Sequence, residues 1–444
     1  MIVSFLFCDI LFGEVMMVLK SETYLQRIKW YKEARFGMFI HFGAYSVPAR
    51  GEWVRSYEQL SIEDYQKYVD AFNPDDCDME KWAKMAKNAG MKYAVLTAKH
   101  HDGYCMFNTQ LTDYKSSRDF VEEFVNAFRK EGLKVGLYFS LIDWHHKDFP
   151  HYKDRQHPER NNEKFKDVYH DFNNYLNFMH GQVNELCTNY GKIDIMWFDF
   201  SYDKMTGEKW QATKLVQMVR RLQPDIILDN RLEASGEGFG SLTSKNPNVY
   251  AGDFASPEQI IPPYGLLNEE GEPILWEACI TMNDHWGYFA DDHNFKETST
   301  IIRKLVECVS KGGNMLLNVG PDARGHFPKE SIQILKEIGD WMSCYSKSIY
   351  GCDNAMMEKP ENGRITKKGN KLYYHIMEMG IGGIALQGIS HDQIEMIINL
   401  SDGSELQPLD FWTVKNYPDI VFVDFKNTNR LPNPIDTVIE VTLK

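Results

Sequence analysis

The sequence predicts a (β/α)8-like barrel followed by a smaller all-β domain, and three observations support this prediction. Short apolar runs alternate with amphipathic helical patterns over most of the chain. These runs resemble strands buried on both faces, which is typical of a parallel sheet. After about residue 350 the segments become short and alternating, and no helical pattern remains. Eight strand–helix units are expected to close into a barrel, and the last segments to form a β-sandwich.

Each expected element has its own pattern. The eight strands are the apolar runs at residues 36–42, 92–99, 134–140, 193–200, 225–231, 248–254, 274–282 and 313–321. Helices are expected over residues 78–88, 118–130, 208–222, 295–309 and 329–346, and over a long segment whose apolar stripe runs from Phe165 to Leu186. We expect the barrel to occupy residues 24–349 and the β-sandwich residues 350–444, with an N-terminal extension over residues 1–23.

Composition and charge narrow the possible partners. The chain has 444 residues and a net charge of −14, which argues against a nucleic-acid partner or an anionic membrane surface. Its eight cysteines form no C-x-x-C pair, which excludes the common zinc-ribbon spacings and favours a reducing compartment. The apolar start carries Asp9 and Glu14, so it fits neither a signal peptide nor a membrane span. We therefore expect a cytoplasmic protein, and the sequence leaves its oligomeric state open.

One strand end carries the clearest chemical signal. The apolar run at residues 193–200 ends in a carboxylate, Asp199, next to Trp197. Catalytic groups of a (β/α)8 barrel lie where its strands end, at the C-terminal face. Asp199 is therefore a candidate nucleophile or base, and the alternative is that it caps the following segment.

Polar and aromatic side chains recur at the other strand ends and in the later loops. They are His41, Glu52, Trp53, His100, His101, Tyr138, Trp197, Asp199, Arg231, Glu258, Glu277 and Trp286. Imidazole, guanidinium and carboxylate groups hydrogen-bond the hydroxyls of a sugar, while Trp and Tyr cover its apolar face. Two carboxylates complete a glycosidase, because one attacks the anomeric carbon and the other protonates the leaving oxygen.

Two other kinds of protein are possible. His100, His101 and Asp102 together with His41 could bind zinc, as in metal-dependent barrel hydrolases. However, adjacent side chains on a strand point to opposite faces, and the chain contains no H-E-x-x-H motif. A carbohydrate-binding protein on an inactive barrel is the second alternative, which the pair of carboxylates disfavours.

Several stretches together resemble the retaining α-L-fucosidases of glycoside hydrolase family 29. They are FGMFIHFGAYSVPARGEW, KYAVLTAKHHDGYCMF, GLYFSLIDW, WFDF, WEACITMNDHWGY and GGNMLLNVGP, in this order between about Trp30 and Pro321. The resemblance implies a fucosylated oligosaccharide or glycoconjugate as substrate, Asp199 as nucleophile, and neither a metal nor an organic cofactor. It also implies a fucose pocket lined by His41, Glu52, Trp53, His100, His101, Tyr138, Trp197, Arg231 and Trp286.

The acid/base has three candidates. Glu258 lies in FASPEQIIP, which is similar to the TPEQ-type loop of the subfamily that prefers α-1,3/4-linked fucose. A loop carboxylate reaches the leaving group readily, so Glu258 is preferred over Glu277, on or beside a strand, and over Asp253. The chain departs from the family pattern at Ser256, which replaces a Thr, and at Phe42, where many members have Trp. It also departs at Phe200, where a Gly is frequent and where the larger side chain is expected to narrow the site.

Overall fold

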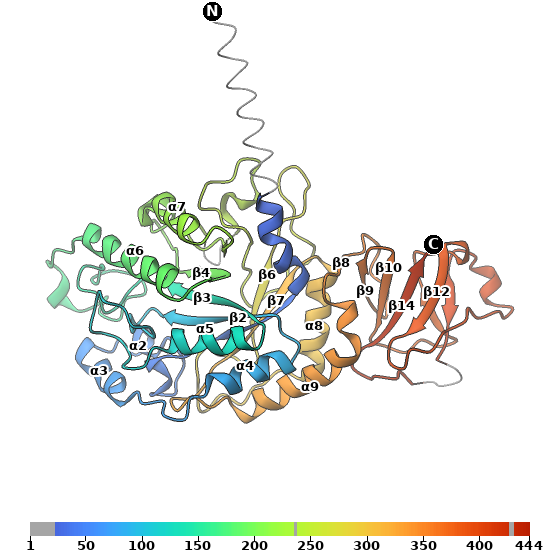
Figure 1. The fold of residues 1–444 in the computed structure, drawn as a ribbon, viewed down its shortest axis with the longest axis horizontal. Coiled ribbons are helices and arrows are strands. Elements are labelled where there is room, and N and C mark those ends of the chain that lie inside the picture. Colours follow the sequence, from blue (N-terminus) through green and yellow to red (C-terminus); the bar gives the residue numbers. More distant parts are fainter. Residues whose placement is uncertain (1–22, 235–237, 426–429) are drawn as a thin grey trace, which may run out of the picture.

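The computed structural model describes residues 23–234, 238–425 and 430–444 (Figure 1). Seven parallel strands form the main sheet in the order β5-β4-β3-β2-β1-β7-β6. They are β1 (Phe36–Ile40), β2 (Tyr93–Lys99), β3 (Lys134–Ser140), β4 (Ile195–Asp199), β5 (Ile227–Leu228), β6 (Glu277–Thr281) and β7 (Asn314–Val319). The predicted parallel barrel-like domain is confirmed. The expected extension over residues 1–23 lies, except for Thr23, outside the described residues.

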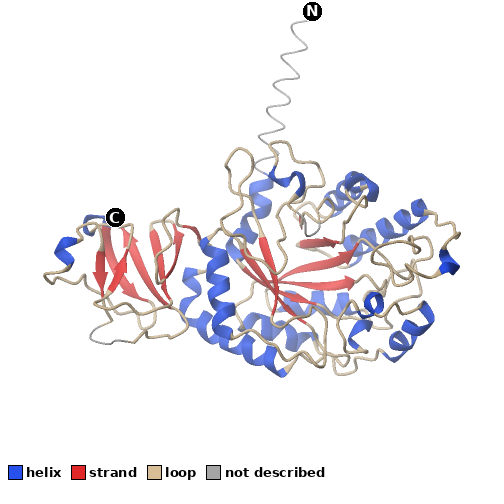
Figure 2. Ribbon diagram, turned by 180° about the vertical axis from the view of Figure 1, so that it is seen from behind, coloured by secondary structure: helices blue, strands red, loops and turns tan. Residues whose placement is uncertain are grey.

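Helices surround this sheet (Figure 2). They are α2 (Val54–Tyr57), α3 (Ile62–Ala71), α4 (Met79–Asn88), α5 (Phe120–Lys130), α6 (Phe172–Asn189), α7 (Ala212–Leu222), α8 (Thr298–Ser310) and α9 (Lys329–Tyr345), and another helix spans residues 23–34. Asp78, Asp119 and Asp171 start α4, α5 and α6, because each side chain accepts a hydrogen bond from a first-turn N–H. Within the described ranges, no helix is both long and apolar enough to cross a bilayer.

The expected sixth strand, residues 248–254, was wrong as a regular element. The chain from Phe254 to Glu258 instead makes three single bridges, Asp229 with Phe254, Ala255 with Trp276 and Glu258 with Cys279, which connect β5 to β6. A continuous ladder does not form, because Pro257 has no N–H to donate toward β6, and because the carbonyl of Ser256 accepts from a side chain, Arg231. The barrel therefore closes through a loop at this point.

The long helix was predicted to start too early. Residues Glu163–Phe165 form a short 3-10 turn, and Val168 is exposed rather than part of an apolar stripe. The helix α6 begins only at Phe172, where Asp171 accepts hydrogen bonds from the N–H groups of Asn173 and Asn174. Apolar spacing alone did not reveal this start signal.

The C-terminal part is antiparallel, as predicted, and has two sheets. The larger has the order β12-β14-β10-β9-β8, and β11 pairs with β13. Their bounds are β8 (Asp353–Asn354), β9 (Gly363–Lys368), β10 (Lys371–Ile376), β11 (Ile384–Leu386), β12 (Ile394–Asn399), β13 (Val421–Val423) and β14 (Thr437–Leu443). Side chains of both sheets share one apolar core. The domain lies against α8 and α9 (Figure 1), where Trp341 Nε1 donates to Asp436 O at 3.1 Å.

A buried ionic clamp fixes the loop that replaces the sixth strand. Asp253, whose side chain is 3% exposed, accepts from Arg27 Nη2 at 2.7 Å and pairs with Arg220. It also accepts from the backbone N–H of Leu228 at 2.8 Å. The clamp thus joins the first helix, α7 and β5 to this loop.

We predict that Asp253→Ala lowers the free energy of unfolding by about 3 kcal/mol, because two arginines lose their buried partner. Urea denaturation followed by circular dichroism measures this loss. The matched control is Asp225→Ala, which breaks the exposed pair with Lys192 and should cost no more than about 1 kcal/mol. Equal losses in the two variants would contradict the role of the clamp.

Candidate active site

The strand ends surround one cavity of about 160 Å³. Ten of the residues singled out in the sequence line it: His41, Trp53, His100, His101, Tyr138, Trp197, Asp199, Arg231, Glu258 and Trp286. The structure brings them together because β1 to β4 are adjacent and parallel, so their C-terminal ends meet at one face. Glu52, Glu277 and Asp253 do not line the cavity.

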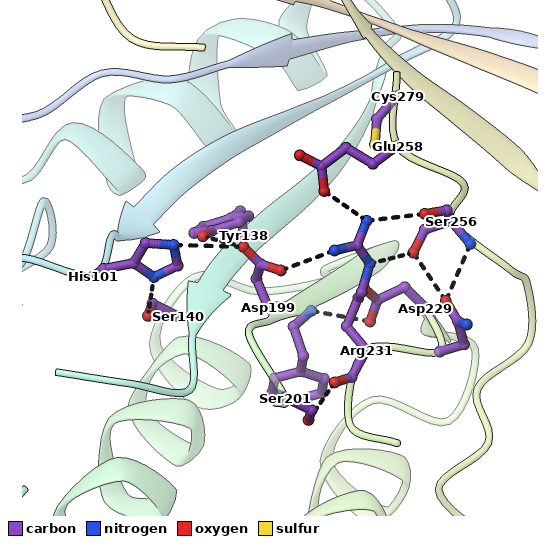
Figure 3. A network of polar contacts seen from close by, with 12 residues as sticks. His101, Tyr138, Ser140, Asp199, Ser201, Asp229, Arg231, Ser256, Glu258 and Cys279 are labelled. Carbon is purple, nitrogen blue, oxygen red and sulfur yellow. Dashed lines mark hydrogen bonds and ion pairs between the residues drawn. The ribbon is translucent and has the colours of Figure 1, made fainter. Parts of the chain in front are cut away.

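Asp199, the last residue of β4, is held by two donors, and His101 Nε2 lies 3.8 Å from its Oδ2 (Figure 3). Its Oδ2 accepts from the hydroxyl of Tyr138 at 2.7 Å, and its Oδ1 lies 3.3 Å from Arg231 Nη1. Burial raises the pKa of Asp199 to about 6, while Arg231 lowers it and Glu258 raises it. Asp199 is therefore ionised at neutral pH and has a fixed orientation.

A single guanidinium, Arg231, contacts both carboxylates of the cavity (Figure 3). Its Nη2 donates to Glu258 Oε2 at 3.1 Å, on the side away from Asp199. Its Nε donates to Ser256 Oγ at 2.8 Å, and Ser256 in turn donates to Asn230 Oδ1 at 2.9 Å. Burial lowers the pKa of Arg231, but the charges of Glu258 and Asp199 outweigh burial and raise it above the ordinary value. This arginine fixes how the two carboxylates face each other.

The histidines of the cavity are neutral and have assignable tautomers. Burial lowers the pKa of His41 to about 3, although its hydrogen bond to Asn318 raises the pKa. Asn318 donates its amide N–H to Trp286 O, so its Oδ1 accepts from His41 Nδ1 at 2.7 Å. Likewise Ser140 donates to Ile142 O and therefore accepts from His101 Nδ1 at 2.8 Å. The Nε2 atoms of His41 and His101 are left as acceptors.

His100 lies between these two rings. Its centroid is 5.7 Å from that of His41 and 4.1 Å from that of His101. Burial, reinforced by the two neighbouring imidazoles, lowers the pKa of His100 well below its ordinary value. Its Nδ1 has no hydrogen-bond partner among the residues that the structure describes. Three neutral imidazoles therefore form one side of the cavity, which suits the recognition of neutral hydroxyl groups.

Aromatic rings form the floor. The centroid of Phe39 lies 5.3 Å from that of Trp197 and 5.9 Å from that of Trp286. Trp197 stacks on Tyr138 at 5.7 Å and carries the guanidinium of Arg231 at 4.9 Å above its ring. These contacts hold a flat apolar surface under the charged groups.

Glu52 lies behind the wall rather than in the cavity. Its Oε2 accepts from the backbone N–H of Gly287 at 2.7 Å, next to Trp286. Burial raises the pKa of Glu52, and the Gly287 N–H opposes this effect. A Cβ at Gly287 would lie 3.0 Å from Glu52 N, so the two segments are in close contact. Glu52 positions Trp286 through the backbone.

The two other acid/base candidates are placed away from the cavity. Glu277 is fully buried at the start of β6, where its Oε2 accepts from the hydroxyl of Tyr93. Burial raises the pKa of Glu277 to about 7, while the Tyr93, Tyr31 and Trp197 donors lower it. Asp253 is occupied by its two arginines. Of the three candidates, only Glu258 reaches the cavity.

Sequence reasoning did not place several lining residues, among them Phe39, Arg155, Tyr202 and Cys279. Arg155 lies in the long segment between β3 and α6, where no strand end marks it. Phe200, noted only as a departure from the family pattern, also lines the cavity and has a φ of 82°. That left-handed conformation costs about 1–2 kcal/mol for a residue other than glycine. The Gly that is frequent at this position in the family pattern was the available signal, because glycine adopts a positive φ without strain.

The arrangement of the cavity side chains does not favour the metal-binding alternative. In the described part of the chain, no three or more His, Cys, Asp or Glu side chains are arranged to hold a metal ion. His101 Nδ1 is engaged by Ser140, and His41 Nδ1 by Asn318. These two Nδ1 atoms therefore serve to orient the imidazole rings.

A buried carboxylate and a second, half-exposed one share an arginine in an aromatic cavity at the C-terminal face of a barrel. This arrangement defines a glycoside hydrolase. A family model described as alpha-L-fucosidase matches residues 18–347. The chain therefore belongs to the α-L-fucosidase family.

Individual relatives agree with this assignment. The chain is 30% identical to the α-L-fucosidase of Dictyostelium discoideum over 72% of this chain and 71% of that protein. It is 56% identical to the structure of α-L-fucosidase isoenzyme 1 from Paenibacillus thiaminolyticus, with a TM-score of 0.92, covering 95% of this chain and 100% of that one.

A further relative carries a covalently bound ligand. It is an α-L-fucosidase of family GH29 from Bacteroides thetaiotaomicron, trapped as a covalent intermediate with 2-fluoro-fucosyl fluoride in a Glu-to-Gln mutant. The identity is 28% and the TM-score 0.80, covering 94% of this chain and 96% of that one.

The raised pKa of Glu277 predicts a pH-dependent stability. Because its pKa is about 7 in the folded protein and about 4.3 in an unfolded chain, the folded state holds the extra proton between these values. Its contribution to stability is present below the unfolded pKa and is lost as the pH rises toward 7.

Glu277→Gln removes this titration, so its stability relative to wild type should increase from pH 4.5 to pH 8. We expect a difference on the order of 3 kcal/mol. Urea denaturation of both proteins at several pH values measures the change. A difference that is constant with pH would contradict the buried, proton-retaining carboxyl.

Proposed function

We propose that the protein is a retaining α-L-fucosidase that acts by double displacement, with Asp199 as nucleophile and Glu258 as acid/base. The observation that supports this most strongly is the shared guanidinium: Arg231 contacts Asp199 at 3.3 Å and Glu258 at 3.1 Å. The covalent intermediate of the related Bacteroides enzyme supports the same chemistry.

The reaction proceeds in two balanced steps. In the first, Asp199 Oδ attacks the anomeric carbon of fucose, the glycosidic C–O bond breaks, and Glu258 transfers its proton to the leaving oxygen. In the second, the Glu258 carboxylate takes a proton from water, the water oxygen attacks the anomeric carbon, and the ester bond to Asp199 breaks. The configuration at this carbon is retained because it is inverted twice.

The two carboxylates suit different roles because their surroundings differ. The side chain of Asp199 is 13% exposed and bound by Tyr138 and Arg231, so it keeps one orientation. The side chain of Glu258 is 39% exposed and lies on a loop at the mouth. The leaving group lies on that side of the cavity, where Glu258 can reach the glycosidic oxygen.

The neutral imidazoles and the aromatic floor complete the sugar site. The Nε2 atoms of His41 and His101 accept hydrogen bonds from sugar hydroxyls, and Trp197 and Trp286 cover apolar faces. A cavity of about 160 Å³ suits a single sugar. The substrate is thus a terminal fucose of an oligosaccharide or glycoconjugate.

We further propose a preference for α-1,3/4-linked fucose, which rests on the SPEQ sequence at residues 256–259. Serine in place of threonine keeps the hydroxyl that Arg231 requires, since Ser256 Oγ accepts from its Nε at 2.8 Å. Gln259 Nε2 donates to Thr281 Oγ1 at 2.9 Å, which fixes the loop to β6. The departure from the family pattern therefore leaves this loop's main contacts intact.

A substrate panel with Glu258→Ala tests the acid/base and the linkage together. The panel is a nitrophenyl α-L-fucoside, 2'-fucosyllactose and an α-1,3/4-branched Lewis trisaccharide. We expect wild type to cleave the branched trisaccharide in preference to 2'-fucosyllactose. Glu258→Ala should lose about 100-fold or more on the trisaccharide, the contribution of general acid catalysis. Azide should restore its turnover of the aryl fucoside, because that leaving group needs no proton in the first step and azide attacks the fucosyl-enzyme in place of base-activated water in the second.

The matched control is Glu270→Ala, an exposed glutamate of the following loop that pairs with Lys245. It should keep wild-type activity on all three substrates. Equal cleavage of both oligosaccharides by wild type would reject the linkage preference. Full activity of Glu258→Ala would reassign the proton donor, and a wild type that binds but never releases fucose would favour the carbohydrate-binding alternative.

The pKa of Asp199 predicts the acid limb of the pH profile. Since the nucleophile must be ionised, kcat/KM should fall as the pH drops through about 6. Tyr138→Phe removes a hydrogen bond that lowers this pKa, so the limb should move to higher pH. Measuring kcat/KM for the aryl fucoside against pH tests this, and an unmoved or lowered limb would contradict the assignment.

A further inference from the structure

Phe200 combines an unfavourable backbone with a position next to the nucleophile. Its φ is 82°, in the left-handed region that bulky side chains rarely occupy, and it directly follows Asp199. Such a conformation persists only where surrounding structure enforces it, and it marks functional positions in proteins. A glycine would adopt this φ without strain. The benzyl side chain must therefore contribute something that a glycine could not.

The ring of Phe200 belongs to a second aromatic group above the floor. Its centroid lies 4.7 Å from that of His101, 5.2 Å from that of Trp53 and 5.3 Å from that of Tyr202. Trp53 stacks in turn on Tyr57 at 5.8 Å and 25°. We call Trp53, Tyr57, Phe200 and Tyr202 the rim platform.

The rim platform leads from the cavity to solvent. Tyr202 is nearly buried, Trp53 and Phe200 are half-buried, and Tyr57 is 75% exposed. Rings serving only as core would not extend outward in this way. A cavity of about 160 Å³ has room for one sugar, so the group attached to that sugar must lie over the rim.

A polar group borders the same surface. Tyr202 donates its hydroxyl to Asp154, which fixes the ring. Next to Asp154, the guanidinium of Arg155 lies 5.7 Å from the Tyr202 centroid and lines the cavity. It is exposed and pairs with Asp203 at 3.4 Å. Flat rings bordered by an accessible guanidinium resemble the general composition of a sugar site.

We propose that the rim platform binds the leaving-group sugar, the pyranose to which fucose is attached, with its apolar face on Phe200 and Trp53 and its hydroxyls toward Arg155. This inference rests on the proposed fucosidase function and adds a second binding site to it. Phe200 would thereby select saccharide leaving groups over small ones. The backbone strain at Phe200 is retained because the ring is needed for this contact.

The test compares two substrates that differ only in the leaving group. α-L-Fucosyl fluoride releases a single atom, which cannot touch the platform, whereas the Lewis trisaccharide places a pyranose over it. In Phe200→Gly the ratio of kcat/KM for the trisaccharide to that for the fluoride should fall about tenfold, the size of a lost aromatic contact. Phe200→Tyr should keep the wild-type ratio, because it keeps the flat ring.

Two further variants separate this effect from misfolding. Phe200→Asn tolerates the left-handed backbone without supplying a ring, so its ratio should fall as in Phe200→Gly. Trp412→Ala removes an 80% exposed aromatic side chain of the C-terminal domain and should keep the wild-type ratio. Thermal unfolding of every variant identifies any that does not fold.

The possible outcomes distinguish the two proposals. A wild type that is inactive on the fluoride and on the trisaccharide contradicts the fucosidase function, and the inference with it. If wild type cleaves both but Phe200→Gly and Phe200→Asn lose the same factor on each substrate, only the leaving-group site is contradicted. A lower ratio in both variants, restored in Phe200→Tyr, supports it.

Discussion

The site depends on one interaction, the contact of the Arg231 guanidinium with Asp199 and Glu258. Two carboxylates in a shared cavity repel each other, and a buried arginine without a partner would be costly. Each of the three charges is tolerable because the other two are present. The guanidinium of Arg231 lies over the ring of Trp197, and its Nε donates to Ser256 Oγ. The proposed chemistry therefore requires Asp199, Arg231 and Glu258 to be in place together.

A loop takes the place of a regular sixth strand in the barrel, and this arrangement depends on that loop. Pro257 and the Ser256 carbonyl, which accepts from Arg231, interrupt the ladder between β5 and β6. The loop so formed carries Glu258 to the mouth of the cavity, and Asp253 fixes its start with two arginines. A regular sixth strand would have directed alternate side chains inward and outward. It would have left no loop to carry a proton donor to the mouth of the cavity.

The fold was largely predictable, because apolar runs and amphipathic helical patterns are local signals. The strand-end rule also brought His41, Tyr138 and Asp199 together correctly, since parallel neighbours end at one face. The loop position favoured Glu258 over Glu277 as the acid/base, but only the tertiary contact with Tyr93 shows that Glu277 is enclosed. The left-handed backbone of Phe200 likewise has no local sequence signature.

The central claim is that Asp199 forms a covalent bond to fucose, while Glu258 donates a proton in the first step and accepts one in the second. The most direct test is peptide mapping by mass spectrometry after incubation of Glu258→Gln with 2-fluoro-fucosyl fluoride. The account predicts one fluorofucosyl adduct, on the peptide containing Asp199. It predicts no adduct in the double variant that carries Asp199→Ala together with Glu258→Gln. An adduct on another carboxylate, or equal labelling without Asp199, would contradict it.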